Sequence, residues 1–247
     1  MRNIIITILV AAGVSTGLIF LMKGNYAFPI LIGILSAVIV FIILTRKATK
    51  ELEAINEKAQ KALYAQKFDR ALRIYESGLS LGKKSPFIVG QIHGLIGMIH
   101  FIRKDYENAK PSLIKSSSMN WVAKGMLAVV CLNEKKYDEM EKYLKIVITS
   151  GKKEALAWAL YAYCLDKINK RDEAIKVLEE GNKKLKETDE RIKTNIIELK
   201  NNRRMRMKQF GDAWYQFMLE RPSAKRVNQQ PGMGGHGAFK KNAMYRG

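Results

Sequence analysis

Two long apolar runs at the start of the chain constrain its fold more than any other feature. Ile4 to Met22 contains 14 apolar residues in 19 and no charge, and Phe28 to Thr45 contains 14 in 18. As helices, such runs extend about 27–28 Å, close to the ~30 Å hydrocarbon core of a bilayer. Because a backbone in lipid must satisfy its own hydrogen bonds, we predict a transmembrane helical hairpin over residues 1–45.

A cleaved signal peptide is the alternative explanation of the first run. Its apolar segment would be unusually long, a single Arg2 precedes it, and Asn25-Tyr26-Ala27 is a poor cleavage site. We therefore expect the first run to be retained, and even after cleavage the second run would remain as an anchor.

The distribution of basic residues predicts the orientation of the hairpin. Arg46, Lys47 and Lys50 follow the second run, whereas the turn between the runs contains only Lys23. Cytoplasmic flanks carry the excess of Lys and Arg. We therefore expect an integral membrane protein with both termini and the soluble part in the cytoplasm, and take a bacterial inner membrane as the default.

Small residues recur at a spacing of four in both apolar runs. Gly13-x-x-x-Gly17 and Gly33-x-x-x-Ala37 would each place small side chains on one helix face. Such faces let two helices approach closely. We expect this packing within the hairpin, with self-association of two copies through the membrane as the alternative.

The rest of the chain is strongly basic and has a helical pattern. The net charge is +20, and the first 45 residues contribute only two basic side chains and no acid to it. After a juxtamembrane linker over residues 46–51, apolar residues recur with the 3.6-residue period of helices and do not alternate. We predict an all-α protein without a sheet.

A short pattern repeats four times in this part of the chain. If each copy belongs to a pair of helices, one pair cannot bury its apolar face alone, so several pairs must stack. The interval between copies averages about 34 residues, the period of helix–turn–helix repeats. The copies begin at Phe68, Tyr106, Tyr137 and Arg171, and their fourth residues, Ala71, Ala109, Met140 and Ala174, are separated by 38, 31 and 34 residues.

These segments resemble the tetratricopeptide repeat family over residues 52–188, most closely in the last repeat. There Trp158 and Ala162 occupy the large and small positions of the first helix, and Ala174 and Leu178 follow on the second. The resemblance implies an α-solenoid of about four helix pairs that binds other proteins.

The resemblance also implies a concave groove lined by the first helix of each repeat. Because exposed apolar surfaces usually bind something, we predict that the groove takes a helical or extended apolar segment. That segment would belong either to a partner protein, which can itself be membrane-bound, or to this chain. The third alternative is that these side chains pack between repeats. The matching positions are Met98, Phe101, Val129, Leu132, Leu156 and Tyr163.

Two further helices are predicted after the repeats, over residues 189–220. The first, from Asp189 to Lys208, would cap the solenoid. The second would be amphipathic, as a lid on the groove or a helix for a partner, with Phe210, Trp214, Phe217 and Met218 at helical spacing. Residues 221–247 contain five glycines, six basic residues and no acid, a composition that predicts a disordered tail.

Basic residues cluster at the end of the predicted capping helix. Beside a membrane, such residues attract anionic lipid, by about 1 kcal/mol each. Nucleic acid is the less favoured ligand because few aromatic residues accompany them, and a solvated basic surface is the third alternative. The cluster consists of Lys200, Arg203, Arg204, Arg206 and Lys208.

The sequence predicts no catalytic residue, no metal site and no cofactor. His93 and His100 share a helix face but lack a Cys, Asp or Glu at ligand spacing. We therefore predict a membrane-anchored scaffold that mediates protein–protein interactions, in the assembly of an envelope or secretion complex. The alternative is a basic module that binds anionic lipid or nucleic acid, with the repeats as a stalk.

Overall fold

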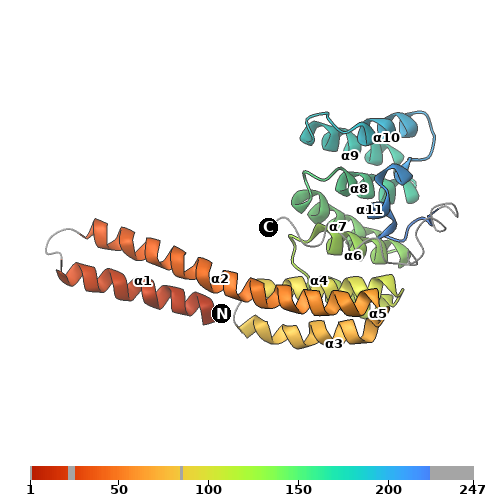
Figure 1. Ribbon diagram of the computed structural model, residues 1–247. Helices are drawn as coiled ribbons and strands as arrows, with labels where there is room; N and C mark the ends of the chain where they lie inside the picture. The colour runs from red at the N-terminus through yellow and green to blue at the C-terminus, as the bar shows by residue number, and fades with distance from the viewer. Residues whose placement is uncertain (1, 22–25, 84–85, 223–247) are drawn as a thin grey trace. The chain divides into compact units, whose positions relative to one another are not determined.

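The computed structural model describes residues 2–21, 26–83 and 86–222, and within them every regular element is helical (Figure 1). This confirms the all-α class. The chain divides into two compact units, Met1–Ile92 and His93–Gly247, described separately below. The elements are α1 (Arg2–Leu21), α2 (Ala27–Tyr64), α3 (Phe68–Gly78), η1 (Leu79–Lys83), α4 (Pro86–Ile102), α5 (Tyr106–Lys115), α6 (Trp121–Asn133), α7 (Tyr137–Ser150), α8 (Ala155–Lys167), α9 (Arg171–Lys184), α10 (Glu190–Lys200), η2 (Met207–Phe210) and α11 (Asp212–Tyr215), where η denotes a 3-10 helix.

In the first unit, α1 and α2 lie side by side (Figure 1). A Cβ atom on Gly33 would overlap Ser15 Oγ and lie 3.0 Å from the Ala11 carbonyl oxygen, so a larger residue here would force the Ser15 side chain to move. Gly13 and Gly17 have no such neighbour within 4 Å. Close packing within the hairpin is therefore correct for Gly33 and wrong for the two glycines of α1. The predicted turn lies largely outside the described residues, which omit 22–25.

Helix α2 continues without a break for 38 residues, from Ala27 to Tyr64. The predicted juxtamembrane linker at residues 46–51 is therefore helical, and no break separates it from the residues on either side. Its sequence, Arg-Lys-Ala-Thr-Lys-Glu, contains neither Gly nor Pro and consists mainly of good helix formers. By length and composition, α2 is the one helix in the described ranges that could cross a membrane.

Four helix pairs, α2–α3, α4–α5, α6–α7 and α8–α9, are each joined by the same turn. A residue with φ near +60° begins it, and the next residue donates its N–H to the carbonyl five positions back, as Lys67 does to Ala62 at 2.8 Å. This bond satisfies a carbonyl that the helix end leaves open. The left-handed residues are Gln66, Lys104, Lys135 and Asn169, with φ from 57° to 63°.

Within the pairs, glycines allow close helix contacts. A Cβ atom on Gly97 of α4 would lie 2.7 Å from Leu113 of α5, and one on Gly181 of α9 would lie 2.6 Å from Trp158 of α8. The first helices form the center of the second unit: ten residues of α6 and eleven of α8 are buried. Helices covered on all sides are mostly apolar all round. The exception here is Lys124 of α6, whose Nζ donates to the carbonyls of Leu113 and Ile114.

Helix α10 ends at Lys200, so the prediction of a helix to Lys208 is wrong. The turn after it has the geometry of the other four: Asn202 has φ 55°, and Arg203 donates its N–H to the Glu198 carbonyl at 2.8 Å. No second helix follows directly. Where such a second helix would begin, the chain carries arginines. The N-terminal end of a helix dipole is positive and disfavours basic side chains. The four preceding second helices carry acids there, at Asp69, Glu107, Asp138, Glu139, Asp172 and Glu173.

Candidate functional site: the return segment and its receiving face

After the turn at Asn202 the chain folds back over α6 and α8 (Figure 1). We call residues 203–220 the return segment. It contains η2 and the four-residue α11, so the predicted amphipathic helix is wrong in form. Gly211 separates the two elements with φ 65° and ψ −143°, a conformation that glycine adopts readily and other residues do not. Gly211 therefore lets the chain bend in a stretch whose aromatic residues have helical spacing.

Two aromatic side chains anchor the return segment, and both are completely buried. The Trp214 ring meets the Tyr163 ring edge-on, with centroids 4.7 Å apart, and Phe217 lies 6.2 Å from Trp121. Such aromatic pairs contribute about 0.5–1.5 kcal/mol beyond the area they bury. Both rings therefore fix the segment on the second unit.

Phe217 reaches its position because α6 carries a glycine opposite it. A Cβ atom on Gly125 would lie 2.8 Å from both Phe217 Cε1 and Leu160 Cδ2. Any larger residue would push the ring out or force the α6 and α8 side chains apart. We call the surface that accepts the segment the receiving face, formed by Trp121, Gly125, Leu160 and Tyr163.

Glu220 closes the far end of the return segment. Its Oε2 accepts a hydrogen bond from Trp214 Nε1 at 3.1 Å, and its Oε1 accepts one from the Tyr163 hydroxyl at 3.4 Å. Burial, and then the charge of Glu220, raise the pKa of Tyr163, so the hydroxyl keeps its proton and remains a donor. The carboxylate thus links the segment to the receiving face.

The near end of the return segment is held by α10. The Glu198 side chain, only 6% exposed, pairs with Arg203 at 2.9 Å and with Arg206 at 2.7 Å. Asn195 is fully buried, and its Oδ1 accepts the backbone N–H of Arg206 at 2.7 Å. Charge-assisted bonds of this kind are the stronger ones in proteins.

A third attachment lies midway, at Arg191 of α10. Its guanidinium lies 4.7 Å from the centre of the Phe210 ring, and its backbone carbonyl accepts a bond from Gln209 at 2.9 Å. Asp189 pairs with the same guanidinium at 2.6 Å and holds it in place. The segment is therefore fixed along its whole length.

The predicted basic cluster is divided by this arrangement. Arg203 and Arg206 pair with Glu198, and Lys200 pairs with Glu179 at 2.6 Å. Arg204 and Lys208 are exposed. Three of the five charges therefore have an acidic partner within the fold. The predicted tail lies outside the described residues from position 223 onward.

The predicted groove is not an open surface. Phe101, for example, is completely buried and packs against Tyr106, 5.6 Å away between ring centroids, within the pair α4–α5. Tyr163 is the member that contacts the return segment, through Trp214. Leu132 is partly buried. The others are at most 7% exposed: Met98, Phe101, Val129, Leu156 and Tyr163.

Among the four predicted aromatic-segment residues, Met218 differs from the rest. It is 37% exposed, whereas Phe210, Trp214 and Phe217 are buried. Sequence reasoning missed three residues of the receiving face, namely Trp121, Gly125 and Leu160. A glycine in the middle of an otherwise apolar helix is the signal that could have indicated Gly125, because such a glycine usually has a packing reason.

Comparisons with known proteins give this chain no family. No family model matches it. No significant match was found among curated proteins or solved structures either. The tetratricopeptide resemblance thus stays a prediction from the sequence.

The chemistry available at buried thiols is limited by their protonation. Burial raises the pKa of Cys164 to about 12 and that of Cys131 to about 11, so both are thiols at neutral pH. The thiolate is the nucleophile and the metal ligand. Within residues 2–21, 26–83 and 86–222, no group of three or more His, Cys, Asp and Glu side chains could hold a metal ion.

Proposed function

We propose that this protein is a membrane-anchored helical scaffold that brings other proteins together at the cytoplasmic face of a membrane. The continuity of α2 carries the proposal. Its first half exposes large apolar side chains to more than half of their area, among them Leu31, Ile34 and Leu35. In water, such a surface would cost roughly 25 cal/mol for each Å², whereas lipid matches it. Its second half forms the first helix pair with α3.

The partner of α2 in the membrane would be α1. It is apolar along its length and exposes Ile8 and Leu9 to 62% and 66%. Arg46 and Lys47, both exposed, follow the apolar stretch of α2 directly and favour the cytoplasmic side. The hairpin would then hold the soluble part at the inner face of a bacterial membrane.

Three features support a tetratricopeptide-like stack for the soluble part. The helix pairs share one turn geometry, and glycines sit at their closest contacts. Ion pairs also link successive pairs: Lys170, before α9, reaches Glu141 of α7 at 2.7 Å. Repeats that contact only their neighbours are stabilised by such interfaces.

The return segment changes where a partner would bind. Because Trp214 and Phe217 already fill the receiving face, we place the partner surface elsewhere on the scaffold. The alternative, a lipid- or nucleic-acid-binding basic cluster, is weakened by the ion pairs of Arg203, Arg206 and Lys200. A tethered scaffold gains from its anchor, since confinement to a membrane raises the local concentration of membrane-bound partners.

Membrane extraction and proteolysis test the anchor. The full chain should remain in the pellet after alkaline carbonate and be released by detergent. Added protease should digest the soluble part in inverted vesicles but not in intact spheroplasts. Release by carbonate would contradict the anchor, and digestion in spheroplasts would contradict the cytoplasmic orientation. Crosslinking in the membrane would then identify the partners.

A further inference from the structure

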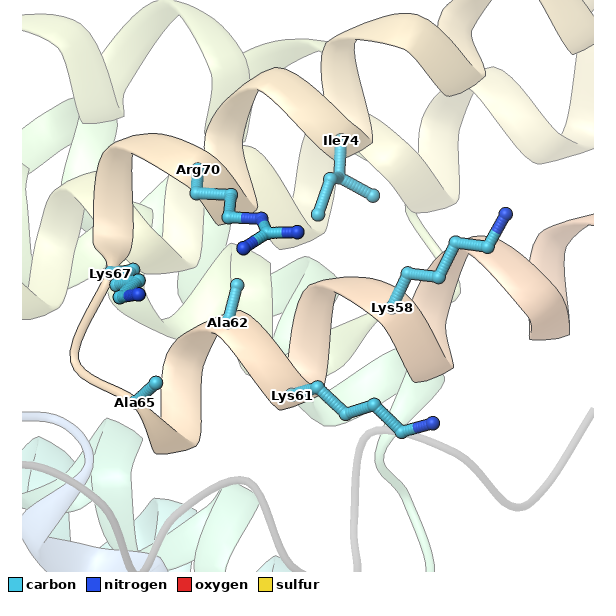
Figure 2. Close-up of a pocket in the computed structure, with 7 residues that line it drawn as sticks. All are labelled: Lys58, Lys61, Ala62, Ala65, Lys67, Arg70 and Ile74. Atoms are coloured by element: carbon cyan, nitrogen blue, oxygen red, sulfur yellow. The ribbon is translucent and has the colours of Figure 1, made fainter.

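A shallow basic pocket lies between α2 and α3, in the first unit. It has a volume of about 340 Å³, and its floor consists of Ala62, Ala65 and Ile74. Figure 2 shows Arg70 and Ile74 extending from α3 toward α2, and Lys58 and Lys61 extending from α2. Lys67, in the turn between the helices, completes the rim. The surface inside the pocket is mainly apolar, and its lining residues include four cations and no acid.

The charges at this pocket are only partly neutralised. Lys61 pairs with Glu57 at 2.7 Å, and both side chains are largely exposed, so this pair is weak. Lys67 and Arg70 form no ion pair with any residue that the structure describes. They contrast with Arg203 and Arg206 of the return segment, which share one buried carboxylate. The pocket therefore keeps a free positive charge that an anion could use.

We propose that this pocket binds an acidic segment of a partner protein, with carboxylates on the cationic rim and one apolar side chain on the floor. The proposal deepens the proposed scaffold function by naming a class of partner. It rests on that function at one point, because the argument against lipid assumes that α2 crosses a membrane. Charge complementarity of this kind selects partners and speeds their encounter. The acidic segment of the partner would lie across both α2 and α3.

The lining of the pocket favours a polymer over a free small molecule. Sites for small ligands are lined mainly by apolar and aromatic side chains with few charges, whereas four of the seven lining residues here are cations. Nucleic acid is disfavoured because the lining contains no aromatic side chain on which a base could stack. An acidic peptide needs neither enclosure nor stacking.

Distance argues against the bilayer as the ligand. Helix α2 is continuous, and Lys58 follows the end of the apolar run at Thr45 by 13 residues, or about 20 Å of helix. At physiological ionic strength the Debye length is about 8 Å. The headgroup region occupies ~5–7 Å of this distance. If α2 crosses the membrane, the near edge of the pocket therefore lies about 12–15 Å from the lipid charges along the helix, which is more than one screening length.

Fluorescence anisotropy on the full chain in neutral detergent micelles tests the proposal. The probe is a fluorescein-labelled peptide of Glu and Asp around one central Leu. The double variant Lys67→Glu and Arg70→Glu should bind it about tenfold more weakly. The control variant, Lys142→Glu and Lys145→Glu, changes the net charge equally at two exposed lysines of α7 and should bind nearly as well as the unchanged protein.

Three probes then separate the alternatives. A peptide with Ser in place of Leu should bind more weakly, because the floor is unfilled. A single-stranded oligouridine, and phosphatidylserine mixed into the micelles, should compete poorly. An equal loss in both double variants, no binding of the acidic peptide, or preferred binding of the RNA or the phosphatidylserine would each overturn the proposal. Because micelles are used, these outcomes do not depend on whether α2 crosses a membrane.

Discussion

The first half of α2 and the whole of α8 are both strongly apolar helices, yet their surroundings differ completely. Eleven residues of α8 are buried, between α6, α9, α10 and the return segment. The apolar half of α2 has α1 beside it and leaves Ile34 57% exposed. Apolar character alone therefore does not show how a helix is covered. The neighbours of α8 bury it, whereas those of α2 leave its apolar half exposed.

The largest effect on stability should come from removing an aromatic ring that packs on the receiving face. Trp214→Ala removes a completely buried ring and its contact with Tyr163, and should lower the free energy of unfolding by about 3–5 kcal/mol. Met218→Ala, at the exposed position of the same segment, should cost at most about 0.5 kcal/mol. Denaturant unfolding of the full chain in detergent, followed by circular dichroism, measures both. Equal effects would mean that the segment does not pack as described.

Glycine substitutions should have opposite signs in the two regions. Gly181→Ala places a methyl group 2.6 Å from Trp158 and should destabilise the fold by about 1–3 kcal/mol. Gly17→Ala meets no neighbour and should be neutral or gain up to about 1 kcal/mol from helix propensity. Thermal unfolding of the two single variants decides this. A loss at Gly17 would show that the open face of α1 is covered, as in a dimer.

The anchor of the return segment on α10 should contribute less than its aromatic side chains. Glu198→Gln keeps the shape but removes the charge that holds Arg203 and Arg206, which should cost about 1–2 kcal/mol. Hydrogen exchange should show faster opening of residues 203–210 and little change in α2. An unchanged exchange rate in the segment would contradict the role given to this carboxylate.

The smallest predicted effect is a pH dependence at Asp105, the N-cap of α5. Hydrogen bonds from Asn108 and then from His100 hold the pKa of Asp105 below its usual value of 3.8. A lowered pKa stabilises the fold above pH 3.8, and this stabilisation is lost as the pH falls through the lower folded value. Asp105→Asn should therefore cost about 0.5 kcal/mol at pH 6. In thermal unfolding the difference should shrink as the pH is lowered from 6 to below 3.8, and a difference that is independent of pH would contradict this role of the carboxylate.

The helix pairs could be predicted from the sequence because their signals are local. Apolar residues recur with the period of a helix, and each second helix carries an acid in its first turn, such as Asp69 or Asp172. The turns follow from these boundaries. Their common geometry, with a left-handed residue such as Lys104 or Lys135, is not specified by residue type, since the position also accepts Gln and Asn.

Two features could not be predicted because they depend on context. At Thr45 the composition changes sharply, which suggests a boundary, but both sides favour helix and α2 simply continues. The return segment depends on the φ of Gly211 and on contacts with residues far away in sequence, such as Trp121 and Gly125. Its helical spacing of aromatic residues predicts burial but not the bend that achieves it.

The central claim is that α2 is one helix, with a membrane span in its first half and the first soluble helix pair in its second. Spin labels introduced by Ile34→Cys and Glu53→Cys, in the full chain reconstituted into liposomes, test it directly. The native thiols Cys131 and Cys164 are buried and should not react. The account predicts that the label at position 34 is accessible to oxygen and protected from a water-soluble nickel complex, and that the label at position 53 shows the reverse. Exposure of both labels to the nickel complex would contradict it.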